Sequence, residues 1–185
     1  MGKKWKTLES EELIRSPFFR MRKEKADMGD GRVMPAYYIF DFADWVQLIP
    51  VTKDLDVVLV EQYRHAYKDT YLEIPGGSIE PNSTEKPEVA AVRELEEETG
   101  YLPGVVEYIG AHQPNPALQS NSIHTYLALD CEPTGTINLD PYEDLVVKLI
   151  PLKELLEKLD QGELRHSLIV ASLCLARKRL LDLIP

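Results

Sequence analysis

Cysteine is scarce in this chain and is not arranged for a structural role. The only two cysteines, Cys131 and Cys174, lie far apart, with no Cys-x-x-Cys pair and no Cys/His spacing. This pattern excludes a disulfide framework and a zinc site built on thiolates. Because it is typical of proteins that work in a reducing compartment, we expect a cytoplasmic protein.

The chain also lacks a long apolar run and an excess of basic residues. No segment approaches the length of a transmembrane helix, and no apolar signal-peptide stretch follows the Lys-rich N-terminus. The formal net charge is −10, which repels long phosphate polymers. We therefore expect neither a membrane nor a nucleic-acid polymer as partner. The 185 residues are 44% hydrophobic and 28% charged, which suits a globular core.

Residues 75–101 carry most of the chemical signal. The stretch opens with Pro-Gly-Gly, and its second half has helical spacing. Pro87 suits the first helical position, where its missing N–H needs no partner. Gly100 stands where a left-handed residue ends a helix. The residues expected to face inward are Ala91, Val92, Leu95 and Thr99.

The same helix gathers three acids on another face. Glu94, Glu97 and Glu98 fall within one arc of about 100°, beside the small residue Ala90. Like charges at i, i+4 cost about 0.2–0.5 kcal/mol, so the arc indicates either a solvated surface or a site that needs the charge. A Gly-Gly turn lets backbone carbonyls approach closely, and an all-oxygen cluster suits Mg²⁺ or Mn²⁺. The pattern favours a metal site.

The helix resembles the second half of the Nudix box, written R-E-U-x-E-E-x-G-U with U apolar or aromatic. Residues 93–101 read RELEEETGY and match every fixed position, and Glu85 precedes Arg93 by the spacing of the box. The spacer between Gly77 and Glu85 is two residues longer than in the box. The additional residues fall in a Pro-Asn-Ser loop, where insertions cost little.

This resemblance implies a metal-dependent hydrolase. The implied ligands of Mg²⁺, with Mn²⁺ as alternative, are Glu94, Glu97, Glu98 and the carbonyl of Gly76. Arg93 and Glu85 are implied to brace the loop and the helix. The metal would neutralise a diphosphate and lower the pKa of a water molecule.

Two further segments resemble the branch of the family that contains ADP-ribose pyrophosphatases and nucleoside diphosphate sugar hydrolases. Residues 62–64, QYR, are similar to its Q-x-R segment, whose Arg lies near the substrate phosphates. A forked guanidinium suits a diphosphate, so Arg64 is an expected substrate contact, although an Arg at a strand end is often a surface residue. Glu73 is a second candidate. Residues 115–119, NPALQ, resemble relatives that act on sugar nucleotides.

Two glutamates are candidates for the general base. Glu143 lies in the acidic segment NLDPYEDL, which by composition alone indicates a solvated loop. In the resembling enzymes a mobile loop here delivers a glutamate to the attacking water, which implies Glu143 as base. Glu97 is the alternative, because helix glutamates are the base in other Nudix branches.

The apolar patterning predicts mixed α and β structure. Strands are expected over 17–50 with a turn at 28–31, then over 57–63, 71–74, 104–112, 122–130 and 144–150, and helices over 152–159 and 163–183. The resemblance implies an α+β Nudix fold, an α/β/α sandwich with a mixed sheet, over residues 41–185. Residues 1–40 would be a small N-terminal β extension that commonly exchanges between subunits in this branch, so we expect a homodimer.

The predicted function is a Mg-dependent pyrophosphohydrolase of nucleoside diphosphate sugars, with ADP-ribose as the first guess. This small-molecule sugar nucleotide would yield a nucleoside monophosphate and a sugar phosphate. One alternative is a Nudix hydrolase of nucleoside triphosphates or dinucleoside polyphosphates. Another is a catalytically silent nucleotide-sugar sensor, against which the intact box argues.

Overall fold

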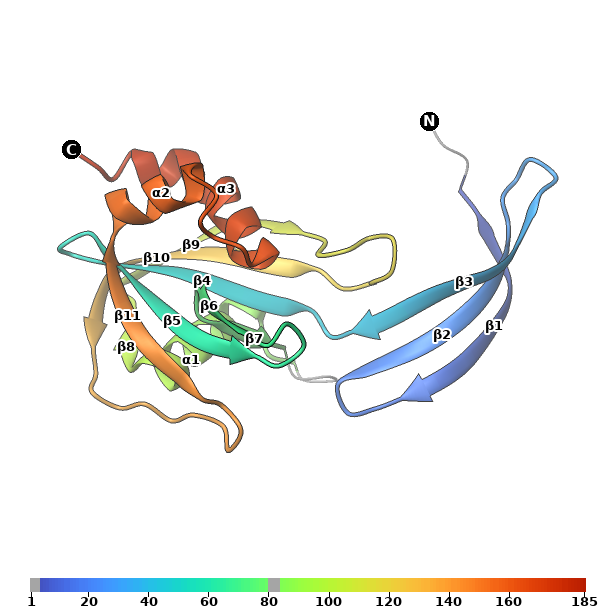
Figure 1. Cartoon of the computed structure of the whole chain (residues 1–185), viewed down its shortest axis with the longest axis horizontal. Helices are drawn as coiled ribbons and strands as arrows, with labels where there is room; N and C mark the ends of the chain where they lie inside the picture. Colours follow the sequence, from blue (N-terminus) through green and yellow to red (C-terminus); the bar gives the residue numbers. More distant parts are fainter. Residues whose placement is uncertain (1–3, 80–83) are drawn as a thin grey trace. The chain divides into compact units, whose positions relative to one another are not determined.

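The computed structural model describes residues 4–79 and 84–185, which form two compact units (Figure 1). The first unit comprises Met1–Asp44 with Gln113–Ser122. The second comprises Trp45–His112 with Ile123–Pro185. The assignment of residues 1–40 and 41–185 to separate domains stays a prediction.

A three-stranded antiparallel sheet forms the first unit. Its strands β1 (Lys6–Arg15), β2 (Phe19–Asp27) and β3 (Val33–Phe42) follow in the order β1-β2-β3. The hairpin of β2 and β3 agrees with the sequence pattern, but β1 was not predicted. Its residues are all exposed, and β1 pairs with β2 through ion pairs such as Lys23–Glu11 and Lys25–Glu9. Because such cross-strand charge pairs need no apolar face, hydrophobic patterning misses this strand.

Residues 113–122 pack against β3 within the first unit. The N–H of Phe40 donates to the carbonyl of Leu118 at 2.7 Å, and the N–H of Ser120 donates to the carbonyl of Phe40 at 3.2 Å. The hydroxyl of Tyr37 donates to the carbonyl of Ala117 at 2.7 Å. Strand β3 therefore holds the Asn- and Gln-bearing loop by its backbone.

The second unit is built on a mixed sheet in the order β11-β5-β4-β10-β8, in which β4 and β10 run parallel. Strands β6, β7 and β9 pair with β5, β4 and β10, respectively. The strands are β4 (Trp45–Thr52), β5 (Asp56–Arg64), β6 (Asp69–Glu73), β7 (Gly76–Ser78), β8 (Tyr101–Leu102), β9 (Val105–His112), β10 (Ile123–Pro133) and β11 (Leu145–Pro151).

Strand β4 changes its neighbour along its length. Its first residues pair with β7, where Gln47 stands opposite Gly76, and near its end Val51 pairs with Val57 of β5. Gly76 was expected in a turn, but it belongs to strand β7. A Cβ on Gly76 would collide with the carbonyl oxygen of Val46, so only glycine lets β7 approach β4 this closely.

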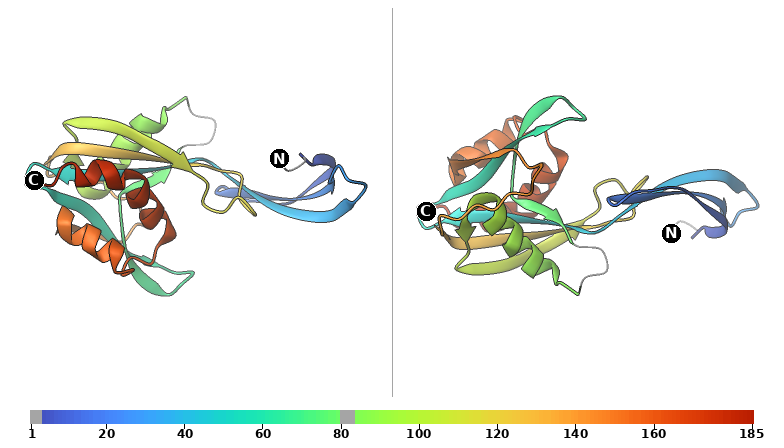
Figure 2. Two further views of the ribbon diagram at one scale, coloured as in Figure 1. Left: turned by 90° about the horizontal axis from the view of Figure 1, so that it is seen from above. Right: turned by 90° about the horizontal axis from the view of Figure 1, so that it is seen from below.

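Helices cover both faces of this sheet, which confirms the α/β/α sandwich (Figures 1 and 2). Helix α1 (Pro87–Thr99) lies on one face, and α2 (Leu152–Asp160) and α3 (Ser167–Leu181) lie on the other. Successive side chains of a strand point to opposite faces. In β4, accordingly, Val46 and Leu48 pack with α1, whereas Ile49 and Val51 join the cluster of α2 and α3.

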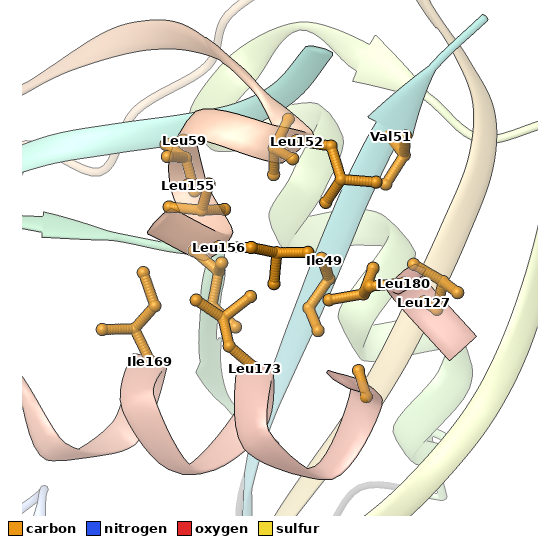
Figure 3. Packing of buried hydrophobic residues seen from close by; sticks show 13 residues of the cluster. Ile49, Val51, Leu59, Leu127, Leu152, Leu155, Leu156, Ile169, Leu173 and Leu180 are labelled. Atoms are coloured by element: carbon orange, nitrogen blue, oxygen red, sulfur yellow. The ribbon is translucent and has the colours of Figure 1, made fainter. Parts of the chain in front are cut away.

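The larger core cluster lies beneath α2 and α3 (Figure 3). Its members contributed by these helices include Leu155, Leu156, Ile169, Leu173 and Leu180. Helical spacing predicted α3 from residue 163, but the helix begins at Ser167. Among the described residues, no helix is both long and apolar enough to cross a membrane.

Candidate active site

Helix α1 brings its acids to Gly76 and Gly77, the first two residues of β7. The helix begins at Pro87, and its C-cap Gly100 has the expected left-handed conformation with a φ of 68°. The N–H of Gly76 donates to Oε2 of Glu98 at 3.1 Å. A Cβ on Gly77 would lie within 2.5 Å of the Glu94 carboxylate. Glycine is therefore needed here so that β7 can lie against the helix glutamates.

The acidic arc of α1 is not a solvated surface. Glu98 is 6% exposed, and the side chains of Glu94 and Glu97 are 13% and 35% exposed. Burial and then the negative charge of Glu94 raise the pKa of Glu98 from 4.5 to about 8. Burial also raises the pKa of Glu94, although the Arg93 guanidinium opposes this shift. In the metal-free protein, therefore, both carboxyls hold their protons at higher pH than an exposed glutamate does.

This donor set fits a hard divalent cation. Buried carboxylates are stable when a cation offsets their desolvation, and carboxylate and carbonyl oxygens are the ligands that Mg²⁺ and Mn²⁺ prefer. Glu98, Glu94 and the backbone of Gly76 and Gly77 in β7 supply such oxygens. In the described part of the chain, however, no group of three or more His, Cys, Asp or Glu side chains is already arranged to hold a metal ion.

Arg93 forms ion pairs with three carboxylates, two of which belong to the acidic arc. Its guanidinium contacts Glu85 at 3.2 Å, Glu94 at 3.0 Å and Glu97 at 2.7 Å. The contact with Glu85 ties the helix to the segment before it, in line with the bracing role implied by the sequence. Glu97 faces Arg93 in this arrangement, so its role as a metal ligand or as a base stays a prediction. The Pro-Asn-Ser loop at 81–83, in which the two additional residues fall, lies outside the described residues.

Arg64 and Glu73 form a bidentate ion pair and line the same cavity as Gly76 and Gly77. Nε and Nη2 of Arg64 donate to the two carboxylate oxygens of Glu73 at 2.7 and 2.6 Å. The side chain of Glu73 is 5% exposed and that of Arg64 is 46% exposed. The hydrogen bonds to Glu73 raise the pKa of Arg64, and so do the charges of Glu98 and Glu143. Arg64 therefore lies close enough to Glu98 and Glu143 for their charges to act on its guanidinium.

Glu143 belongs to the same electrostatic group. Its Oε2 accepts a hydrogen bond from the N–H of Asp140 at 2.9 Å, and its own N–H donates to the carbonyl of Asp140 at 2.9 Å. This pair holds the segment in a turn. The charge of Glu143 contributes to the raised pKa values of Glu94 and Glu98 after the effect of burial. The fold thus brings the acidic segment 138–145 towards α1.

A cavity of about 680 Å³ adjoins this group. Among its lining residues are Arg64, Glu73 and Gly76, which the sequence singled out. Others were not predicted, namely Trp45, Gln47, Tyr67, Tyr71, Arg165 and His166. These residues come from separate segments, and none belongs to a recognisable motif. The one available signal was Gln47, a polar residue inside the otherwise apolar strand segment WVQLIPV.

The fold and the acidic helix beside the Gly-Gly pair of β7 define a class of hydrolases that act on phosphoanhydride bonds. A comparison with protein-family models matches residues 45–173 to the NUDIX domain. The chain therefore belongs to the Nudix family of hydrolases.

Curated relatives agree with this assignment. The methanol dehydrogenase activator of Bacillus methanolicus is 30% identical over 151 residues, covering 79% of this chain and 80% of the relative. An ADP-ribose pyrophosphatase of Bacillus subtilis (strain 168) is 30% identical over 123 residues, covering 66% and 65%. An ADP-sugar pyrophosphatase of Mus musculus is 36% identical over 127 residues, covering 64% and 57%.

A solved structure shares the fold over nearly the whole chain. The crystal structure of an ADP compounds hydrolase superposes with a TM-score of 0.82 at 23% identity, covering 97% of this chain and 96% of that one. The curated pyrophosphatase relatives place the chain in the branch of the Nudix family that contains ADP-ribose pyrophosphatases, as the sequence predicted.

Proposed function

We propose that this enzyme hydrolyses the diphosphate of nucleoside diphosphate sugars, with ADP-ribose as the first substrate to test. The products are a nucleoside monophosphate and a sugar phosphate. The observation that carries the proposal is that Arg64 lines the same cavity as Gly76 and Gly77, the two glycines against which the acids Glu98 and Glu94 lie. A forked guanidinium suits the two phosphates, and the acids suit a cation that neutralises them. The names of the pyrophosphatase relatives support this substrate class.

Glu94 and Glu98 are the first ligands in this proposal, with Mg²⁺ as the ion and Mn²⁺ as the alternative. The carbonyl of Gly76 and the carboxylate of Glu97, which is paired with Arg93, would be the further ligands. The bound cation supplies charge neutralisation for the diphosphate. Glu143 accepts the proton of the attacking water, and its turn with Asp140 keeps its carboxylate near the acids of α1. Glu97 is the alternative base.

A substrate panel tests this proposal. ADP-ribose, GDP-mannose and nucleoside triphosphates are compared with Mg²⁺ present and with the products identified. We expect kcat/KM for a sugar nucleotide to exceed that for any triphosphate at least about tenfold, a difference of roughly 1.4 kcal/mol. Release of pyrophosphate from a triphosphate as the fastest reaction would instead favour the triphosphatase alternative. Tight binding of sugar nucleotides without turnover would favour the silent sensor.

The similarity to a methanol dehydrogenase activator supports a second candidate function, activation of a dehydrogenase. Alcohol oxidation by methanol dehydrogenase is measured with and without the purified protein. An increase in rate that disappears with the variant Glu98→Gln would link activation to the hydrolase site. An unchanged rate would remove this candidate.

We further expect the protein to be a homodimer that the first unit helps to build. Phe18 is 82% exposed, and Trp5 and Tyr38 are 43% and 47% exposed on the same small sheet unit. A sheet this small gains stability when such side chains are covered. Light scattering at micromolar concentration should give twice the chain mass, and Phe18→Ser with Tyr38→Ser should shift the mass towards the monomer. Leu149→Ser, which changes an exposed residue of the second unit, is the control.

A monomeric mass of the unmodified chain at that concentration would contradict dimerisation.

A further inference from the structure

Gln47 is a buried polar side chain in the wall of the cavity. It lies on β4 opposite Gly76 of β7, the strand against which the acids of α1 lie. The residue is 6% exposed and lines the cavity. A buried amide normally has its hydrogen-bonding groups satisfied, so its contacts indicate which part of it is left for a ligand.

Two buried hydroxyls hold one end of this amide. The hydroxyl of Ser172, on α3, donates to Oε1 of Gln47 at 2.7 Å. The hydroxyl oxygens of Ser172 and Thr125, on β10, are 2.9 Å apart. Both hydroxyl-bearing residues are fully buried. The three side chains therefore form a relay that runs from β10 through α3 to the cavity.

The hydroxyl hydrogens decide which end of the amide faces the cavity. Each hydroxyl has one hydrogen, and both are used when Thr125 donates to Ser172 and Ser172 donates to Gln47. In the reverse arrangement Nε2 of Gln47 would donate to Ser172, and one of the two hydroxyl hydrogens of Ser172 and Thr125 would have no acceptor among residues 4–79 and 84–185. Leaving a buried donor unpaired is costly. The Nε2 group is thus the end turned to the cavity, without a partner in the described structure.

The cavity offers further hydrogen-bond donors. Ser167 and Leu168, the first residues of α3, line it, and no side chain of the described residues caps the first turn of this helix. The free N–H groups of a helix N-terminus favour oxygen atoms that carry negative charge. The acceptor atoms of Glu73, in contrast, are both engaged by Arg64. The surplus of donors therefore matches a ligand rich in acceptor oxygens.

Tyr67 and Tyr71, two aromatic residues of the cavity, do not form a slot for a flat base. The guanidinium of Arg165 lies over the ring of Tyr71, 5.2 Å from its centre. The ring of Tyr67 stands edge-on to that of Tyr71, with an interplanar angle of 84°. Stacking a base between two rings requires parallel faces, which these two tyrosines do not provide. A hydroxyl-bearing ring needs no such slot.

We propose that the cavity binds the sugar-phosphate half of the substrate and that Nε2 of Gln47 donates a hydrogen bond to one of its oxygens. Gln47 is then a specificity-determining residue, and Ser172 is the positioning residue that keeps the amide donor turned inward. This assignment rests on the proposed function, because the substrate class comes from there.

Calorimetric titration of the full chain with ribose 5-phosphate, and separately with AMP, tests the assignment. Gln47→Glu keeps the size of the side chain but replaces the inward donor by an acceptor. We expect its affinity for ribose 5-phosphate to fall at least tenfold, with less than a threefold change for AMP. Ser172→Ala should weaken ribose 5-phosphate binding by about three- to tenfold, because the amide can then rotate.

Thr125→Val is the matched control. It removes a buried hydrogen bond of the same relay, but Ser172 still donates to Gln47, so the affinity for ribose 5-phosphate should stay within threefold despite a lower melting temperature. Circular dichroism shows whether each variant is folded, and if Gln47→Glu is not, Ser172→Ala against Thr125→Val decides.

Three results would overturn the assignment. They are an unmodified protein that does not bind ribose 5-phosphate, folded variants of Gln47 and Ser172 that bind it normally, and an equal loss of AMP affinity. If ADP-ribose is not hydrolysed but ribose 5-phosphate binds in a Gln47-dependent way, the proposed reaction fails while the sugar-phosphate pocket stands.

Discussion

We expect Glu98→Gln to lower kcat by about a thousandfold, roughly 4 kcal/mol of transition-state stabilisation, while the protein stays folded. Glu98 is the most buried of the three acids and is held by the N–H of Gly76. The amide keeps the size of the side chain but removes the charge that would hold the cation. Steady-state kinetics over a range of Mg²⁺ concentrations measure the loss.

The same variant should change how stability depends on pH. The folded state raises the pKa of Glu98 to about 8 from its ordinary 4.5, so the metal-free native protein binds this proton more tightly than the unfolded chain does. Its contribution to stability is full below 4.5 and is lost as the pH rises towards 8. In the presence of a chelator, Glu98→Gln should therefore remove part of this fall and melt at a higher temperature at pH 8.

Glu96→Gln is the matched control on the same helix, and it should retain near-normal kcat. Near-normal turnover in both Glu97→Gln and Glu98→Gln would rule out the metal site on α1.

The second large effect is expected for Glu143→Gln. Losing the general base should lower kcat by about 10²- to 10⁴-fold and leave KM nearly unchanged. The physical reason is that an amide keeps the contact with the N–H of Asp140 but cannot accept the proton of water. Single-turnover kinetics separate this chemical step from binding, and Asp144→Asn, the neighbouring acid, serves as control.

The opposite result would identify a different general base. If Glu143→Gln retains near-normal turnover and Glu97→Gln is inactive, the base is on α1, and Glu97 must then leave Arg93 during the reaction.

Much of the catalytic helix could be predicted because its signals are local. Pro87 and Gly100 mark its ends through their own backbone preferences, and spacing along the helix groups Glu94, Glu97 and Glu98. These helical features depend on neighbours within a few residues, so a sequence displays them. The layers of the sandwich were implied by the resemblance to the family, and both faces of β4 are apolar, as a strand covered on two sides requires.

The sequence-based prediction of strands and helices failed where contacts with another segment decide the local structure. Strand β1 has no apolar face and pairs through charges supplied by β2, so its own pattern does not mark it. Residues 163–166 have helical spacing but precede α3. There, Arg165 instead pairs with Asp69 and covers the ring of Tyr71. A contact with a distant strand outweighs a weak local preference.

The sequence alone was sufficient for the family and the acidic helix, because motif spacing and helical period are properties of nearby residues, and the resemblance to the family then implied the layers of the sandwich. Only the folded chain could show that Glu97 faces Arg93, that Arg64 is paired with Glu73, and that a cavity opens beside them. The orientation of the Gln47 amide likewise depends on Ser172, which is distant in sequence. Such contacts arise when remote segments exclude water together, and no local pattern encodes them.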